Sequence, residues 1–241
     1  MADVAREHIE NGSVIRVEQH ASWTKAGAVV SHLPDDEIVA LEERAAATIG
    51  DSSPLGWWSF ATGTWILGTV IGGAFAPGAF AATAPVLLAL AGLTQFIAGL
   101  FAYRKANTLA ATAFCSFGAL YVVLATVYTM QLANLLPPSG APEVMLGFLL
   151  ESFGFIALAL TVAAMRTNAV IVGLLGLLTI GYVLAGIPLL ENAFGQGAAG
   201  IIGNIGGWFL VASAFVAYYA GMAHIVNSTW KRTALPIGGE P

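Results

Sequence analysis

The chain has 241 residues, of which 57% are hydrophobic and only 10% are charged, and its mean hydropathy is +0.78. A soluble globular domain carries roughly 25% charged residues, so this composition excludes that class and predicts a multi-pass membrane protein. The net charge of −5 comes from the first 51 residues, which hold ten acidic and four basic residues, and nothing in it indicates nucleic-acid binding.

The N-terminal segment is predicted to be an acidic cytoplasmic tail over residues 1–50. Residues 1–33 mix charges with Gly and Ser and show no sustained period. Residues 34–49 predict a short amphipathic helix, because Pro34 suits a first turn and the acidic residues after it complement the helix dipole. Its narrow apolar stripe consists of Ile38, Leu41, Ala45 and Ile49. The tail either keeps the chain soluble at this end or has a regulatory role.

Six apolar stretches follow, each near the roughly 20 residues that cross a hydrocarbon core about 30 Å thick. We therefore predict an all-α membrane protein with six transmembrane helices in residues 51–230 and a short cytoplasmic C-terminal tail over 231–241. The predicted spans are 57–75, 85–103, 109–132, 144–165, 169–190 and 201–226.

The basic residues predict the orientation of these spans. Every Lys and Arg beyond the tail lies between spans 2 and 3, between spans 4 and 5, or after span 6. The positive-inside rule then places both termini on the cytoplasmic side. The expected location is the cell membrane, that is, the inner or plasma membrane. These residues are Arg104, Lys105, Arg166, Lys231 and Arg232.

No catalytic or cofactor-binding pattern is visible in the sequence. There is no Walker loop, no metal-ligand spacing and no nucleophile beside a base, and the four His are far apart. We therefore predict a protein that is not an enzyme and holds no metal or cofactor.

Two polar side chains fall inside predicted spans. Glu151 lies about two turns into the fourth span, where burying an acid costs about 2.5–3.5 kcal/mol, so it needs a polar cavity or a partner. It is either a proton-linked, pore-lining carboxylate or an acid that bonds across helices or reaches the interface. Gly147 and Gly154 share its face, and Gln95 in the second span also requires hydrogen-bond partners.

Small and aromatic residues recur at helical spacing in several spans. Pairs with Gly-x-x-x-Gly spacing, Gly68/Gly72 and Gly203/Gly207, predict tight helix contacts within or between subunits. Stripes of larger side chains line one face of the first span and one face of the third, where they serve packing or a pathway. The stripes are Phe60, Thr64 and Leu67, and Phe117, Tyr121 and Tyr128.

Three groups of residues, at matching spacing, resemble the acetate uptake transporter family over residues 51–238. The first is Pro54-Leu55-Gly56 followed by Phe60. The second is the run Gln95-Phe96-Ile97-Ala98-Gly99 with Arg104-Lys105-Ala106-Asn107-Thr108 and Thr112 to Gly118. The third is Gly207-Trp208, Tyr219-Ala220, Asn227 and Arg232 to Gly238.

This resemblance implies a homo-hexameric ring of six-helix subunits in the lipid bilayer, with one narrow pathway in each subunit. It also implies transport of acetate and similar small monocarboxylates, coupled to protons. The family's central constriction of Phe, Tyr and Leu matches Phe60, Phe117 and Leu178 here, so Phe117 replaces the Tyr. Asp51 and Ser52 replace an Asn and a Pro of the family motif, and Ala102 stands where relatives often carry Glu.

The remaining candidate residues follow from these assignments. Unpaired N–H groups at the start of the first span are candidates to hold a carboxylate. Asp51 and Glu151 are candidate proton-linked groups. An alternative is a conduit for another small solute, such as ammonia or a larger carboxylate, and a third hypothesis is a membrane sensor or scaffold that uses the acidic tail. The candidate substrate-binding residues are Pro54, Leu55, Gly56, Thr64, Gln95 and Tyr121.

Overall fold

The computed structural model describes residues 34, 36–41, 49–75, 80–136, 140–191 and 197–238, and it divides into two compact units, Met1–Gly50 and Asp51–Pro241. In the first unit residues 36–41 are helical, and the N–H groups of Glu37 and Ile38 donate to the carbonyl of Pro34. These residues fall within the helix expected over 34–49, of which 42–48 lie outside the described residues. The tail expected over 1–33 also lies outside them.

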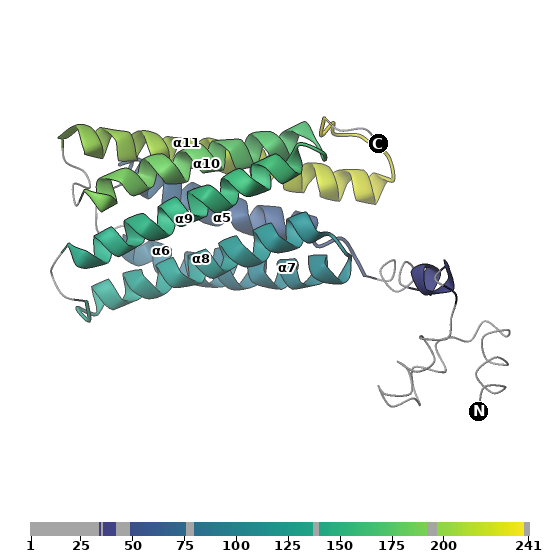
Figure 1. Ribbon diagram of the computed structural model, residues 1–241, viewed down its shortest axis with the longest axis horizontal. Helices are drawn as coiled ribbons and strands as arrows, with labels where there is room; N and C mark the ends of the chain where they lie inside the picture. The colour runs from purple at the N-terminus through teal and green to yellow at the C-terminus, as the bar shows by residue number, and fades with distance from the viewer. Residues whose placement is uncertain are drawn as a thin grey trace, which may run out of the picture. The chain divides into compact units, whose positions relative to one another are not determined.

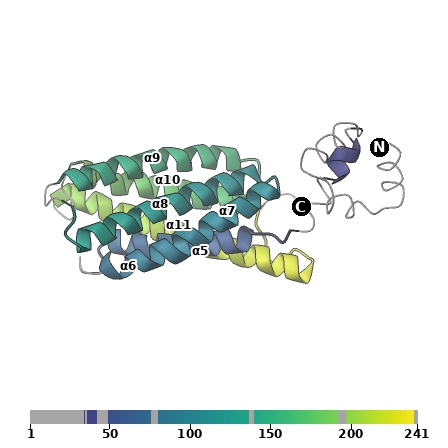
Figure 2. The same ribbon diagram turned by 90° about the horizontal axis from the view of Figure 1, so that it is seen from below.

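The second unit is a bundle of helices, and its described residues contain no strand (Figures 1 and 2). This confirms the all-α fold class. α6, η2 and α7 follow one another without a break, and η2 is a π-helix. The elements are α5 (Ser53–Ile71), α6 (Phe80–Val86), η2 (Leu87–Thr94), α7 (Gln95–Arg104), α8 (Thr108–Leu132), α9 (Ala141–Ala164), α10 (Ala169–Leu190) and α11 (Gly197–Trp230).

The helix boundaries depart from the predicted ones where side chains or proline alter the backbone. α10 is an exception, because it begins and ends as predicted. The side chain of Asn168, the residue before α10, accepts a hydrogen bond from the Ile171 N–H. The helix predicted from residue 85 begins earlier, and Pro85 lies inside it. Proline cannot donate an N–H, and the backbone widens into η2 directly after it, where the Thr94 hydroxyl donates to the Ala89 carbonyl.

Five helical segments in the described part of the chain are long and apolar enough to cross a membrane. α5 has 19 residues, a suitable length, but Gly, Ser, Thr and Trp interrupt its apolar residues, so its composition is less hydrophobic. The five are Ala82–Arg104, Thr108–Leu132, Ala141–Ala164, Ala169–Leu190 and Gly200–Trp230.

The helices of the second unit form a ring. α9 packs on α10, α10 on α11 and α11 on α5, while α5 packs on η2 and α7, which pack on α8. α8 and α9 touch only sparingly, so the ring has its weakest seam between them. The buried core lies inside this ring and draws large side chains from α5, α8 and α10.

Glycine brings the backbones of α5 and α11 into direct contact. A methyl group added at Gly207 would lie 2.3 Å from the Gly72 nitrogen and 2.7 Å from the Gly68 oxygen. The tight contact predicted for Gly68, Gly72 and Gly207 is therefore made within one chain. Gly203 instead faces α10, where an added methyl would lie 2.6 Å from the Pro188 ring.

The described end of the C-terminal tail is fastened to the helices. The Asn227 side chain accepts hydrogen bonds from the N–H groups of Ala234 and Leu235 and donates to the Leu235 carbonyl. The Ala169 N–H, at the start of α10, donates to the Gly238 carbonyl. The tail therefore links the end of α11 to the beginning of α10.

The glycine contact yields a stability prediction. Gly207→Ala should lower the free energy of unfolding by about 1–3 kcal/mol, because the added methyl meets backbone atoms that cannot move aside cheaply. Thermal unfolding of the detergent-solubilised protein measures this. Gly173→Ala is the matched control, since nothing lies within 4 Å of the added carbon. Equal midpoints for the two variants would contradict the contact.

Candidate functional site

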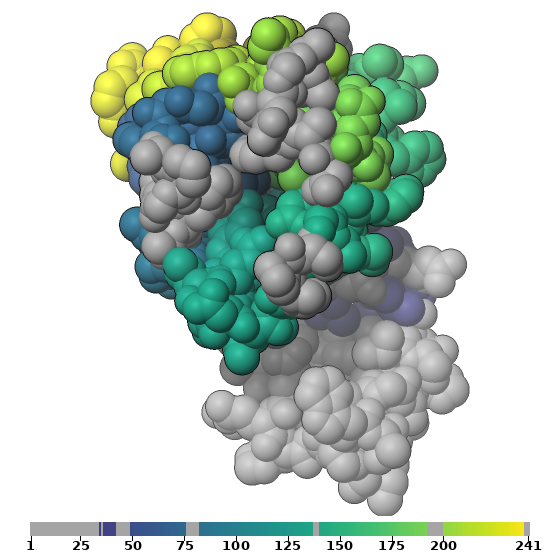
Figure 3. Space-filling model, turned by 90° about the vertical axis from the view of Figure 1, so that its left-hand side faces the viewer, coloured from purple at the N-terminus to yellow at the C-terminus, as the bar shows by residue number. Residues whose placement is uncertain are grey.

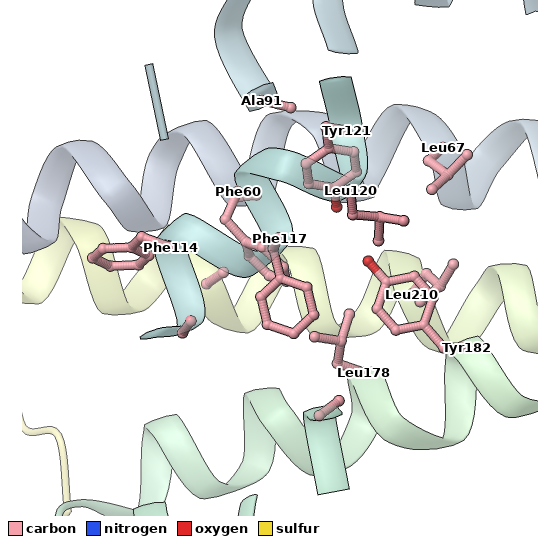
Figure 4. Close-up of a cluster of buried hydrophobic side chains, with 14 of the residues drawn as sticks. Phe60, Leu67, Ala91, Phe114, Phe117, Leu120, Tyr121, Leu178, Tyr182 and Leu210 are labelled. Carbon is pink, nitrogen blue, oxygen red and sulfur yellow. The ribbon is translucent and has the colours of Figure 1, made fainter. Parts of the chain in front are cut away.

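A group of buried side chains fills the middle of the ring, and we call Phe60, Phe117, Tyr121, Leu178 and Tyr182 the central plug. Phe60 and Phe117 are each 1% exposed and Leu178 is fully buried. The Phe117 ring lies between Phe60 and Leu178 (Figure 4), and its centroid is 5.6 Å from that of Phe60. The structure thus brings together three residues that are far apart in the sequence.

The central plug contains a short series of hydroxyl groups. The Thr64 hydroxyl donates to the Phe60 carbonyl at 2.8 Å and is hydrogen-bonded to the Tyr121 hydroxyl. Because Thr64 has only one proton to donate, Tyr121 is the donor in the second bond. The Tyr182 hydroxyl points toward Tyr121 (Figure 4). The plug is therefore apolar in its rings but lined by polar groups on one side.

Gln95 is fully buried at the start of α7, directly after η2. Neither its amide nitrogen nor its amide oxygen has a hydrogen-bond partner among the residues that the structure describes. A buried polar group without a partner costs about 1–3 kcal/mol. The sequence predicted that Gln95 needs hydrogen-bond partners, and the described residues supply none. Both polar atoms can therefore bind water or a ligand.

A polar pocket of about 290 Å³ lies at the end of the ring where α5 begins. Three of the departures from the family pattern, Asp51, Ser52 and Ala102, fall in this one pocket. The His224 ring approaches the Ala220 carbonyl through Nδ1 at 2.7 Å, so Nδ1 donates and Nε2 remains available. The pocket is lined by Asp51, Ser52, Ser53, Ala102, Lys105, Asn107 and His224.

Asp51 occupies the N-terminal end of α5. Its Oδ1 accepts hydrogen bonds from the Ser53 N–H at 3.0 Å and from the Ser53 hydroxyl at 2.8 Å. Among the residues expected to hold a carboxylate there, Pro54 has no N–H and Gly56 donates to the Ser52 carbonyl. The side chain of Leu55 is 47% exposed. The Asp51 carboxylate thus accepts a hydrogen bond from one of the backbone N–H groups at this helix end.

An apolar pocket of about 170 Å³ lies at the opposite end of the ring. Figure 3 views this end of the bundle. The polar residues that line this apolar pocket are Tyr128, Gln131 and Glu143, and Glu143 is the one charged residue among its lining residues. The Glu143 Oε2 is buried and has no hydrogen-bond partner in the described part of the chain. The aliphatic lining is Leu67, Ile71, Leu124, Leu146, Leu150 and Leu189.

Glu151 lines neither pocket. A methyl group added at Gly186 of α10 would lie 2.6 Å from the Glu151 Oε1, and this oxygen is buried without a partner among the described residues. Gly147 and Gly154 also face α10, close to the side chains of other residues. The small residues around Glu151 therefore serve the packing of α9 on α10.

Several residues of these features were not singled out as site residues from the sequence, among them Tyr182, Lys105, Glu143 and His224. Tyr182 lies four residues after Leu178, so helical spacing alone would have placed both on one face. Lys105 was used only to orient the spans and within the family resemblance, and no pattern in the sequence singles out Glu143 or His224. Among the described residues, no group of His, Cys, Asp and Glu could hold a metal ion.

The sequence pattern of the GPR1/FUN34/yaaH family matches residues 38–237. The succinate-acetate/proton symporter SatP of Escherichia coli (strain K12) is 30% identical over 148 residues, covering 61% of this chain and 74% of that protein. Acetate permease A of Emericella nidulans is 26% identical over 209 residues, covering 81% of this chain and 68% of that protein.

A solved structure, that of the bacterial acetate channel SatP, superposes with a TM-score of 0.70 and 27% identity. It covers 79% of this chain and 99% of the channel. These similarities confirm the resemblance found in the sequence. Together with the five apolar helices, they show that the chain is a multi-pass membrane protein whose relatives are transporters and channels rather than enzymes.

The contacts of Asp51 yield a second stability prediction. Asp51→Ala should lower the free energy of unfolding by about 0.5–2 kcal/mol, because the Ser53 N–H loses its acceptor at the helix end. Asp51→Asn keeps an acceptor oxygen and should retain most of this stability. Chemical or thermal unfolding of both variants in detergent measures the difference. Equal loss in the two would show that the charge, and not the acceptor, stabilises the helix end.

Proposed function

This chain belongs to the GPR1/FUN34/yaaH family, and we propose that it carries acetate and similar small monocarboxylates across the cell membrane. The observation that carries the proposal is the arrangement inside the ring. A polar pocket and an apolar pocket lie at opposite ends, and the central plug lies between them. The matched relatives, a succinate-acetate/proton symporter and an acetate permease, support the choice of acetate.

In this proposal Phe60, Phe117 and Leu178 form the constriction of the pathway. Their full burial inside the ring, away from lipid, supports this role. Polar groups beside the constriction bind the passing acid, namely Thr64, Gln95 and Tyr121. Gln95 supports this best, because both of its amide atoms are buried and free. Pro54, Leu55 and Gly56 form the rim of the pathway at the polar pocket.

A plug of this composition favours a small neutral molecule. Moving an ionised carboxylate into an apolar constriction is far costlier than moving the protonated acid, which has one hydroxyl to donate. Movement of the acid together with its proton is therefore the simplest form of proton coupling. We propose Asp51 and Glu151 as further proton-linked groups, supported by the place of Asp51 in the polar pocket and by the unpaired oxygen of Glu151.

We propose six spans per subunit, with α5 as the additional one. α5 tolerates its less apolar composition because most of its residues are buried against other helices and not exposed to lipid. The basic residues beyond Asp51 support cytoplasmic termini, which places the polar pocket at the cytoplasmic end and the apolar pocket at the outer end. The homo-hexamer remains a proposal from the family resemblance.

Uptake of labelled acetate tests the function. Proteoliposomes with an acidic exterior should accumulate acetate faster than protein-free liposomes, and collapsing the pH gradient should abolish the accumulation. Lactate, succinate and ammonium as competitors separate acetate transport from a conduit for another solute. Uptake no faster than in protein-free liposomes would contradict the proposal.

The constriction generates its own prediction. Phe60→Ala and Leu178→Ala should widen the plug and raise uptake of the larger acids lactate and butyrate relative to acetate. Each truncation should also cost about 2–5 kcal/mol of stability, so rates are compared at equal amounts of folded protein. Phe155→Ala and Leu158→Ala are matched controls, since these side chains are 72% and 49% exposed on α9. If the ratio of lactate or butyrate uptake to acetate uptake is unchanged in both plug variants, Phe60 and Leu178 do not form the constriction.

A further inference from the structure

We propose that Glu143 acts as a charge filter in the apolar pocket. Its negative charge repels acids that carry a second, ionised carboxylate. The filter makes the pathway favour monocarboxylic over dicarboxylic acids. This inference rests on the proposed function, because it assumes that acids reach the central plug through the apolar pocket.

The pocket surrounds Glu143 with groups that cannot neutralise it. α5 and α10 contribute only aliphatic side chains to the lining, and α8 contributes Leu124, Tyr128 and Gln131. One carboxylate oxygen, Oε2, is buried without a hydrogen-bond partner in the described residues. A negative charge on this oxygen, beside apolar walls, acts over a longer range than the same charge in water, because apolar surroundings screen it less.

No cation is available nearby to offset this charge. The sequence contains no Lys or Arg from Ala106 to Met165 or from Thr167 to Trp230. The titratable groups closest to this end are Tyr128 on α8, Glu151 eight residues farther along α9, and Glu191 directly after α10. They are uncharged or acidic, so the field in the pocket is negative.

The position of Glu143 in the first turn of α9 has a simpler explanation, since acids there complement the helix dipole. An acid with only that role can direct both oxygens into solvent. Glu143 instead places one oxygen in the wall of a cavity that is otherwise apolar. The polar pocket differs, because it holds Lys105 and His224 together with Asp51. The apolar end of the ring therefore holds an acid alone, whereas the polar end holds charges of both signs.

Such a field distinguishes acids by the charge that remains after one protonation. A monocarboxylic acid that gains one proton is neutral and enters the pocket without opposition. A dicarboxylic acid that gains one proton still carries an ionised group and meets a like charge in a poorly screened cavity. The filter therefore acts on charge and not on size.

The experiment uses competition in proteoliposomes containing the full chain. Labelled acetate uptake is measured at mildly acidic pH with unlabelled succinate or its monomethyl ester as competitor. The two competitors are close in size, but the ester has only one ionisable group. The variants are Glu143→Gln, which removes the charge with little change in shape, and Glu143→Lys, which reverses it. Glu191→Gln is the matched control, because Glu191 is exposed and does not line the pocket.

In the unaltered protein the ester should compete better than succinate. Glu143→Gln should lower the inhibition constant of succinate by about tenfold and leave that of the ester nearly unchanged. Glu143→Lys should lower the succinate constant further, and Glu191→Gln should behave like the unaltered protein.

Equal competition by succinate and its ester in the unaltered protein would overturn the inference, even if a variant failed to fold. So would a succinate constant that is the same in Glu143→Gln as in the unaltered protein. Both results require measurable acetate uptake, so they are distinct from failure of the proposed function, in which the unaltered protein takes up no acetate.

Discussion

The direct backbone contact between α5 and α11 is the constraint on which the rest of the ring depends. Gly68, Gly72 and Gly207 have no side chain to hold the two helices apart. In a membrane, where lipid removes most of the hydrophobic drive between helices, such close packing is a main source of association. With one face of α5 against α11, its adjacent face turns inward. That face places Phe60 and Thr64 in the middle of the ring.

The inside of the ring combines dense packing with polar groups that packing leaves unsatisfied. A methyl group added at Gly63 of α5 would lie 2.2 Å from the Ala91 Cβ of η2, so α5 and the π-helix are also in close contact. Directly after η2, Gln95 is buried, and neither of its amide atoms has a hydrogen-bond partner in the part of the chain that the structure describes. π-helical turns widen the backbone and recur at functional sites. Here the widened turn packs on α5 beside Gly63 and leads into Gln95, whose amide has no partner among the described residues.

The sequence predicts the helices of this fold better than it predicts their interior. Apolar length placed α10 correctly, because Asn168 and the charged Glu191 flank a long apolar run. The first span was predicted to begin at residue 57, whereas α5 begins at Ser53, where the Asp51 carboxylate accepts a hydrogen bond from the Ser53 N–H. Helical periodicity placed Phe60 and Thr64 on one face. It does not report which helices are neighbours, so the meeting of Phe60, Phe117 and Leu178 came from the family resemblance.

The two ends of the ring differ in the groups that they offer to an acid in the proposed pathway. An acid that arrives at the apolar pocket is most stable there with its proton attached, because the pocket offers aliphatic walls and a single carboxylate. The central plug preserves that preference. In the proposed pathway the same acid meets Lys105 at the polar pocket, where the ammonium group favours its ionised form and Asp51 opposes it. Loss of the proton at that end makes return through the plug unfavourable. In the proposed pathway the acid and its proton therefore cross the central plug together, and the gradients across the membrane set the direction of net movement.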